Sequence, residues 1–188
     1  YLPPMYDEGG RFPVVMLLPG FLSTHVSFFA HEPFKRNVIE VFDDQIARGE
    51  SAPAILVMPD ATNRWGGSQF LDSPATGLYQ TYLAEEVLSL VDGALRTIPG
   101  PGARAVVGKS SGGFGALRLG LDRPDAFLAV GSHAGDADFE VSFRPMWTNA
   151  AIALAKAGGL AAFLDAVTRG GPRDAMGFDL LFVCATSA

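Results

Sequence analysis

The residues best suited to chemistry in this sequence are a serine and the small residues around it. Ser110 stands at the centre of a Gly-x-Ser-x-Gly pattern that runs from Gly108 to Gly112. A β-branched run precedes the pattern and a helical one follows it, so we expect the serine at a sharp turn from strand to helix. Such a turn presents the hydroxyl above the sheet, at the positive end of the helix. This context favours a nucleophile over the alternative, a glycine-rich turn that only tightens packing.

A serine that attacks a carbonyl needs N–H groups to stabilise the charge that develops on the oxygen. The backbone N–H of Ser111, directly after the nucleophile, is one candidate donor. The second is the N–H of Phe21, which follows the Pro19-Gly20 turn at the end of an early apolar run. That turn is also compatible with an ordinary bend that places Phe21 in the core. The presence of the Ser110 pattern favours the donor.

Three further residues are candidates for the wall of a substrate pocket. Trp65 and Arg64 lie in a polar, glycine-rich loop, where the ring could contact substrate and the guanidinium could face an anionic group. Anchoring of the loop by Trp65 and solvation of Arg64 are equally compatible with the pattern. His133 is expected beside the site. With Asp136 it should shape its loop through hydrogen bonds to backbone, because a base and its carboxylate so close in sequence rarely face a nucleophile together.

The other chemically active side chains imply no cofactor and no metal. The remaining histidines, His25 and His31, are expected at the surface or in structural roles. Together with the single cysteine, Cys184, they show no spacing typical of metal ligands. Phe28 and Phe29 are expected in the core rather than in a pocket.

The hydrophobic pattern predicts the elements that must position these residues. Short apolar runs predict buried strands at residues 12–18, 54–58, 103–107 and 127–131. Helices are predicted at residues 34–46, 79–91, 114–121 and 149–167, the last with a break at Gly158-Gly159. Strands that alternate with helices indicate an α/β fold with a mostly parallel sheet and helices on both faces. Ligands of such sheets bind beyond the carboxyl ends of the strands, where Phe21, Trp65 and Ser110 are expected.

Several segments together resemble one esterase family of α/β-hydrolases, which includes enterochelin esterase-like proteins, S-formylglutathione hydrolases and the antigen 85 mycolyltransferases. These segments are residues 1–4, 7–15, 17–20, 65–68, 108–116 and 132–136. The resemblance implies an α/β-hydrolase fold, ester substrates, Ser110 as nucleophile, and Phe21 and Ser111 as oxyanion donors. Pro19 stands where the family often has histidine, which alters the floor of the pocket.

The resemblance also bears on the rest of a catalytic triad. In α/β-hydrolases the acid and then the histidine follow the nucleophile, on loops after later strands. The one histidine after Ser110 is His133, which comes too early for that order. We therefore expect a single hydrolase domain over residues 1–188 that is truncated before its last strands, with the acid and the base beyond Ala188. Because the chain opens with Tyr1, residues upstream are expected to be missing as well.

Composition limits the classes of function. Of the 188 residues, 48% are apolar and 18% are charged, which excludes a disordered chain. A net charge of −6 argues against a nucleic-acid partner, since a phosphate backbone needs a basic face. No uninterrupted apolar stretch has the length of a membrane span. The single cysteine favours a reducing compartment and so predicts a cytoplasmic location.

These observations together predict a serine esterase that acts on a small-molecule ester through an acyl-enzyme. Two alternatives stay open: an acyltransferase of the same fold, and a non-catalytic binding domain of the same fold. Acetyl, aromatic and siderophore esters and glutathione thioesters are all compatible with the pattern.

Overall fold

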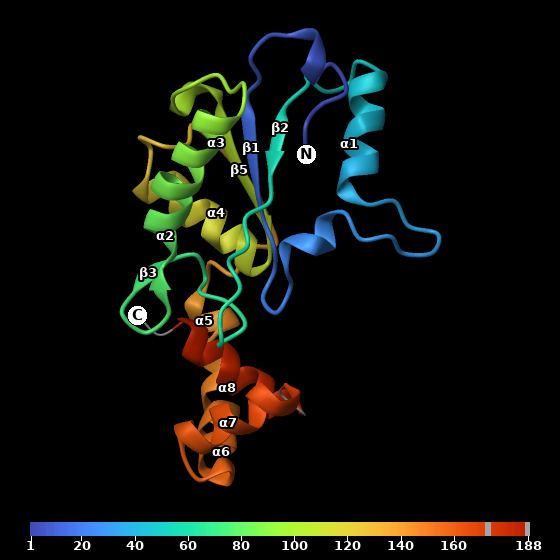
Figure 1. Ribbon diagram of the computed structural model, residues 1–188. Helices are drawn as coiled ribbons and strands as arrows, with labels where there is room; N and C mark the ends of the chain where they lie inside the picture. Colours follow the sequence, from blue (N-terminus) through green and yellow to red (C-terminus); the bar gives the residue numbers. More distant parts are fainter. Residues whose placement is uncertain (172–173, 187–188) are drawn as a thin grey trace.

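The computed structural model describes residues 1–171 and 174–186. Its centre is a four-stranded sheet in which all strands run parallel (Figure 1). In spatial order the strands are β2 (Ile55–Val57), β1 (Val14–Leu18), β5 (Arg104–Lys109) and β6 (Ala129–His133). A separate antiparallel hairpin consists of β3 (Asp72–Ser73) and β4 (Gly77–Leu78). The predicted α/β architecture with a mostly parallel sheet is confirmed.

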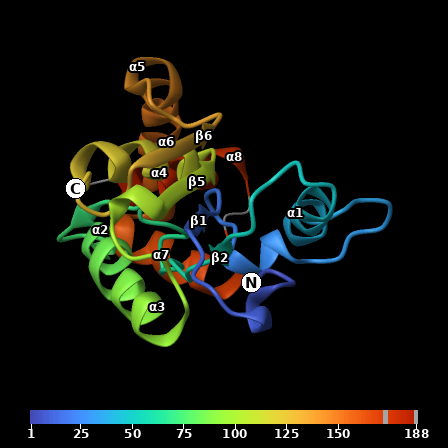
Figure 2. The same cartoon turned by 90° about the horizontal axis from the view of Figure 1, so that it is seen from above.

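The helices surround this sheet in three groups (Figures 1 and 2). One face is covered by α2 (Tyr79–Thr81), a π-helical segment (Tyr82–Val87), α3 (Leu88–Ala94) and α4 (Ser111–Asp122). On the other side lies α1 (Val38–Ala47). Beyond the carboxyl ends of the strands lie α5 (Phe139–Ser142), α6 (Arg144–Ala157), α7 (Leu160–Gly170) and α8 (Ala175–Thr186). Short 3-10 helices occur at Tyr6–Glu8, His25–Phe28 and Pro101–Ala103.

The main core lies between the sheet and the helices α3 and α4. Alternate side chains of a strand share one face, and side chains three and four apart share one face of a helix. The strand members are Val14, Met16, Leu18 and Val106, and the helix members include Leu83, Leu88, Ala116 and Leu119. This packing fixes the start of α4 against the ends of β1 and β5, where the predicted nucleophile lies.

The predicted start of the first helix, at residue 34, is wrong. Helix α1 begins at Val38, after Asn37. The Asn37 side chain accepts a hydrogen bond from the Glu40 N–H at 3.0 Å, and the Glu40 carboxylate accepts one from the Asn37 N–H at 3.0 Å. This capping box satisfies two N–H groups and so fixes where the helix starts. Phe34 precedes it as a fully exposed residue with φ of 64°.

The fourth strand was predicted as buried, and this is wrong. Strand β6 is largely exposed, and Leu128 just before it is 72% exposed. The cause is its place at the edge of the described sheet, where it pairs with β5 alone. Phe127, inside the predicted strand, is buried but precedes β6. An apolar run does not distinguish a central strand from an edge strand.

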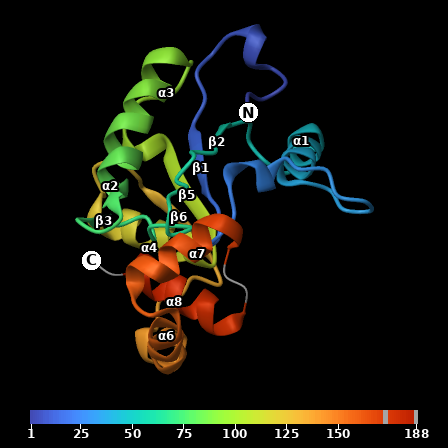
Figure 3. The ribbon, with the colours of Figure 1, turned by 60° about the horizontal axis from the view of Figure 1, so that its bottom comes forward.

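The C-terminal helices form a second apolar cluster. The predicted break at Gly158-Gly159 is confirmed, since both residues have positive φ and separate α6 from α7 at an angle of 91°. The run from Phe178 onward was expected to be buried, and Leu180, Leu181, Phe182 and Ala185 of α8 are buried. Residues 187 and 188 lie outside the described residues. Figure 3 shows α7 and α8 beyond the ends of β5 and β6.

The described helices were also compared with the requirements of a membrane span. None of them meets the length and apolarity required on its own. The bent pair of α6 and α7 meets them jointly, by length and composition.

Candidate active site

Ser110 occupies a strained turn between β5 and α4. Its backbone angles are φ 55° and ψ −122°, a region that residues with a side chain rarely adopt. Such a conformation costs about 1–3 kcal/mol and persists only where the surroundings hold it. Here the Ser110 N–H donates to the His133 carbonyl at 2.9 Å, and the Ser110 carbonyl accepts from the Phe114 N–H at 2.9 Å. The predicted strand-to-helix turn at Ser110 is therefore present.

The glycines of the pattern are required by close backbone contacts. A Cβ on Gly108 would lie 2.1 Å from the Gly112 carbonyl oxygen. A Cβ on Gly112 would lie 2.1 Å from the Leu18 carbonyl oxygen. The absence of both side chains allows the first turn of α4 to contact the end of β1. The pattern thus brings the serine to the turn that carries Phe21.

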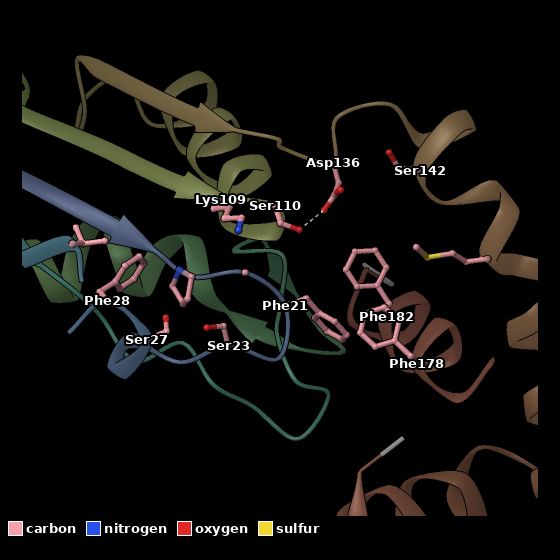
Figure 4. A pocket seen from close by; sticks show the side chains of 14 residues that line it. Phe21, Ser23, Ser27, Phe28, Lys109, Ser110, Asp136, Ser142, Phe178 and Phe182 are labelled. Atoms are coloured by element: carbon pink, nitrogen blue, oxygen red, sulfur yellow. Dashed lines mark hydrogen bonds between the residues drawn. The ribbon is translucent and has the colours of Figure 1, made fainter. Parts of the chain in front are cut away.

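A cavity of about 630 Å³ opens beside Ser110, beyond the carboxyl ends of the strands (Figure 4). Its polar side includes Ser110, Lys109 and Asp136, and its apolar side includes Phe178 and Phe182 of α8. The remaining lining residues are Pro19, Gly20, Phe21, Ser23, Ser27, Phe28, Val38, Ser142 and Met146. A cavity that combines an apolar wall with a few polar groups is typical of small-molecule sites.

Phe21 takes part in the cavity both through its backbone and through its ring. A Cβ on the preceding Gly20 would lie 3.7 Å from the Ser110 Cβ, so this turn adjoins the serine. Across residues 1–171 and 174–186, the Phe21 N–H donates no hydrogen bond. The ring packs edge-on against Phe178 and Phe182, with centroids 5.5 and 4.7 Å away. The backbone N–H of Phe21 is thus available near Ser110.

Ser111 is the first residue of α4, and N–H groups in the first turn of a helix have no acceptor within that helix. Its side chain is buried, and its hydroxyl donates to the Gln69 side-chain oxygen at 2.5 Å. The side chain therefore fixes the turn, and only the backbone of Ser111 is suited to contact a substrate. Gln69, which is 1% exposed, was not singled out from the sequence.

The Asp136 carboxylate contacts the side chain of Ser110 directly. The Ser110 hydroxyl donates a hydrogen bond to it at 3.4 Å (Figure 4). We expected Asp136 to shape its loop through hydrogen bonds to backbone, and the structure shows instead a hydrogen bond with the Ser110 side chain. Partial burial raises the pKa of the Asp136 carboxyl above its ordinary value, and the hydrogen bond from Ser110 opposes that shift. The signal that could have identified Asp136 is its position just after β6, the strand that pairs with β5, which ends directly before Ser110.

His133 contributes its backbone to the site rather than its imidazole. Its carbonyl accepts the hydrogen bond from the Ser110 N–H, whereas its side chain is exposed and does not line the cavity. His25 lies 3.9 Å from Asp60, and His31 lies 3.6 Å from a carboxylate on α1. Across the described part of the chain, no imidazole hydrogen-bonds to Ser110. The structure therefore does not support His133 as a pocket residue.

Trp65 and Arg64 also lie away from the cavity lining, which corrects the pocket interpretation. Trp65 is 7% exposed, packs in the second apolar cluster and donates from Nε1 to the Ala75 carbonyl at 3.3 Å. The Arg64 guanidinium lies 5.0 Å above the Trp65 ring at the surface. The loop-anchor alternative therefore describes Trp65. Phe28, expected in the core, lines the cavity instead.

The parallel sheet, the strained serine between a strand and a helix, and the cavity beyond the strand ends define the class of α/β-hydrolases. Within that class, the family described as "Putative esterase" matches residues 1–168, and the chain belongs to this family. The predicted resemblance is thereby confirmed.

This chain covers only part of the length of each relative that it matches. An esterase of Mycobacterium tuberculosis (strain H37Rv) is 30% identical over 114 residues, which are 57% of this chain and 24% of that esterase. The structure of a ferulic acid esterase matches with a TM-score of 0.60 at 29% identity, over 71% of this chain and 50% of that one. The enterobactin esterase of Shigella flexneri matches with a TM-score of 0.54 at 23% identity, over 76% of this chain and 35% of that one. The chain thus spans about a quarter to a half of these relatives.

Proposed function

We propose that this chain is a serine carboxylic-ester hydrolase that acts on small-molecule esters. The observation that carries the proposal is Ser110 itself. Its hydroxyl lies in the cavity wall, and its backbone is held in the strained turn typical of hydrolase nucleophiles. Membership of the esterase family supports the same chemistry.

In the proposed reaction, the Ser110 oxygen forms a bond to the ester carbonyl carbon while its proton passes to a histidine. The carbonyl oxygen becomes an oxyanion, which accepts hydrogen bonds from the N–H groups of Phe21 and Ser111. The bond to the alcohol oxygen then breaks, and the alcohol leaves with the proton. Water repeats these steps on the acyl-enzyme and releases the acid. In α/β-hydrolases generally, the acid and then the histidine follow the nucleophile on loops after later strands.

For the acyl group, we infer an aromatic one. The rings of Phe21, Phe178 and Phe182 contact one another along one side of the cavity, and an aromatic wall of this kind suits a planar ring, which packs against it by stacking or edge-on contact. The ferulic acid esterase compared above is named for an aromatic acid, which supports the same inference.

Covalent labelling of the intact protein with a fluorophosphonate tests the nucleophile. We expect a single modification on Ser110 and none in Ser110→Ala. Hydrolysis of p-nitrophenyl acetate should fall at least about a thousandfold in the same variant. Ser142→Ala is the matched control, because Ser142 also lines the cavity and should keep both reactions. Turnover at the wild-type rate in folded Ser110→Ala would refute the proposal.

A non-catalytic binding domain is the second candidate, because no imidazole of the described residues contacts Ser110. Binding of benzoate esters without labelling and without turnover would favour it. The acyltransferase alternative shares Ser110 and differs in the second substrate. Rates of ester formation in added alcohols, compared with hydrolysis, separate these two.

A further inference from the structure

The cavity holds two charged side chains among its described lining residues, and they differ in setting. Asp136 is half-buried, whereas Lys109 is exposed. The two do not form an ion pair with each other in the described part of the chain. A charge that is partly withdrawn from water is screened less than an exposed one. The electrostatic character of the cavity beside the nucleophile is therefore set mainly by the Asp136 carboxylate.

The loop that carries Asp136 is held firmly against the nucleophile turn. A Cβ on Gly135 would lie 2.8 Å from the Gly113 carbonyl carbon and 2.9 Å from the Phe114 nitrogen. The preceding residue, Ala134, has φ of 50°, which turns the chain sharply after β6. The backbone of this loop therefore packs closely against the start of α4, which places the Asp136 carboxylate 3.4 Å from the Ser110 hydroxyl (Figure 4).

A fixed carboxylate at this place interacts with any charge on a bound acyl group. The carbonyl carbon that Ser110 attacks must lie next to its oxygen, so the acyl group extends from a point close to Asp136. For a unit charge about 8 Å from the carboxylate and an effective dielectric constant of about 30, Coulomb's law gives about a tenfold change in affinity. The sign is unfavourable for an anion and favourable for a cation.

We propose that Asp136 is a specificity-determining residue, which selects against anionic acyl groups and in favour of cationic ones at the Ser110 site. The proposal rests on the proposed function, because it takes the cavity beside Ser110 as the acyl site. It concerns binding, and its test needs no turnover.

Three benzamides with matched rings probe this selection: 4-methylbenzamide, 4-carboxybenzamide and 4-(trimethylammonio)benzamide. Their dissociation constants are measured by titration calorimetry on the intact protein and on Asp136→Asn. The substitution removes the charge and keeps an oxygen acceptor for the Ser110 hydroxyl. Asp138→Asn is the matched control. Asp138 is exposed and caps α5 by accepting from the Val141 N–H at 3.1 Å, a role that asparagine fills equally well.

In the wild type we expect the cationic amide to bind more tightly than the anionic one. Asp136→Asn should reduce this preference at least about tenfold, and it should change the affinity for the neutral amide less than twofold, which reports an intact cavity. Asp138→Asn should leave the preference within twofold of wild type. Absence of measurable binding by all three amides would overturn the proposal, as would a preference that Asp136→Asn does not reduce. Fluorophosphonate labelling of Ser110 is scored separately, so failure of the nucleophile and failure of the charge selection give different results.

Discussion

Replacing Gly112 with alanine adds one methyl group where two backbone segments meet. The new Cβ would lie 2.1 Å from the Leu18 carbonyl oxygen and 2.6 Å from the Leu18 carbonyl carbon. Real Cβ atoms essentially never come closer than 3.0 Å to another heavy atom, so the two segments must separate by about 0.9 Å. Neither is able to yield by rotating a side chain, because both contacts are to backbone.

Two consequences of that separation are expected in Gly112→Ala. Forcing extra volume into a packed interior costs about 1–3 kcal/mol in the free energy of unfolding, and a backbone contact belongs at the upper end. The separation also moves Ser110 away from the turn that carries the Phe21 N–H. A misplacement of about 1 Å lowers catalysis about a hundredfold, so ester hydrolysis and the rate of fluorophosphonate labelling should both fall by that factor.

Gly120→Ala is the matched control on the same helix. Its Cβ would meet the Val130 Cγ2 at 2.2 Å, but this contact is to a methyl group of a 42% exposed residue, and one change of χ1 rotamer moves that methyl away. Alanine also favours the helix by up to about 1 kcal/mol over glycine, so stability should hold or rise. Urea unfolding and labelling rates are measured for both variants. Wild-type stability and a wild-type labelling rate in Gly112→Ala would refute the reasoning.

Other substitutions separate structural from chemical roles. Trp65→Ala should lower the free energy of unfolding by about 3–5 kcal/mol in urea titrations, because the ring is buried. Arg64→Ala should lower it by less than about 1 kcal/mol. Equal losses in the two variants would contradict the loop-anchor role of Trp65. Burial raises the pKa of Asp136, so the native state binds that proton more tightly than the unfolded chain does. The stability that this group contributes is present at low pH and is lost as pH rises through the raised pKa. Asp136→Asn should therefore have a higher melting temperature than wild type at pH 7, and the difference should vanish near pH 3. His133→Gln should change kcat less than about tenfold, since its imidazole does not contact the nucleophile, and a loss as large as that of Ser110→Ala would identify it as the base.

The parts of the fold that sequence predicted are those with a local physical cause. The central strands form continuous apolar runs, and the Gly158-Gly159 break follows from glycine's freedom at positive φ. The exposure of β6 has no such local cause. It depends on how many strands flank it, which is a property of the whole sheet.

The residues of the candidate site likewise divide into those with a local sequence signal and those without one. Ser110 and its glycines were predictable because the turn imposes residue types at fixed spacing. The contact of Asp136 with Ser110 depends on how close two loops approach, and the aromatic wall depends on where α8 folds back. Neither is encoded as a short pattern. The role of Trp65 was also not decided by its sequence context, because an aromatic residue in a loop is compatible with both a pocket wall and a loop anchor. Its neighbours in the second apolar cluster identify it as an anchor.

We therefore expect the two sides of the cavity to differ in how well they tolerate amino-acid substitutions. On the polar side, glycines with no room for a Cβ hold the ends of β1 and β5 against the start of α4, so Ser110 and the N–H groups near it belong to one closely packed unit. On the apolar side, Phe178 and Phe182 reach the cavity from α8, and both rings contact the ring of Phe21. Ring-to-ring contacts tolerate substitution far better than backbone-to-backbone contacts do. We therefore expect substitutions at Phe178 or Phe182 to disturb the turn at Ser110 less than substitutions at Gly112, because the described backbone hydrogen bonds of Ser110 go to His133 and Phe114 rather than to α8.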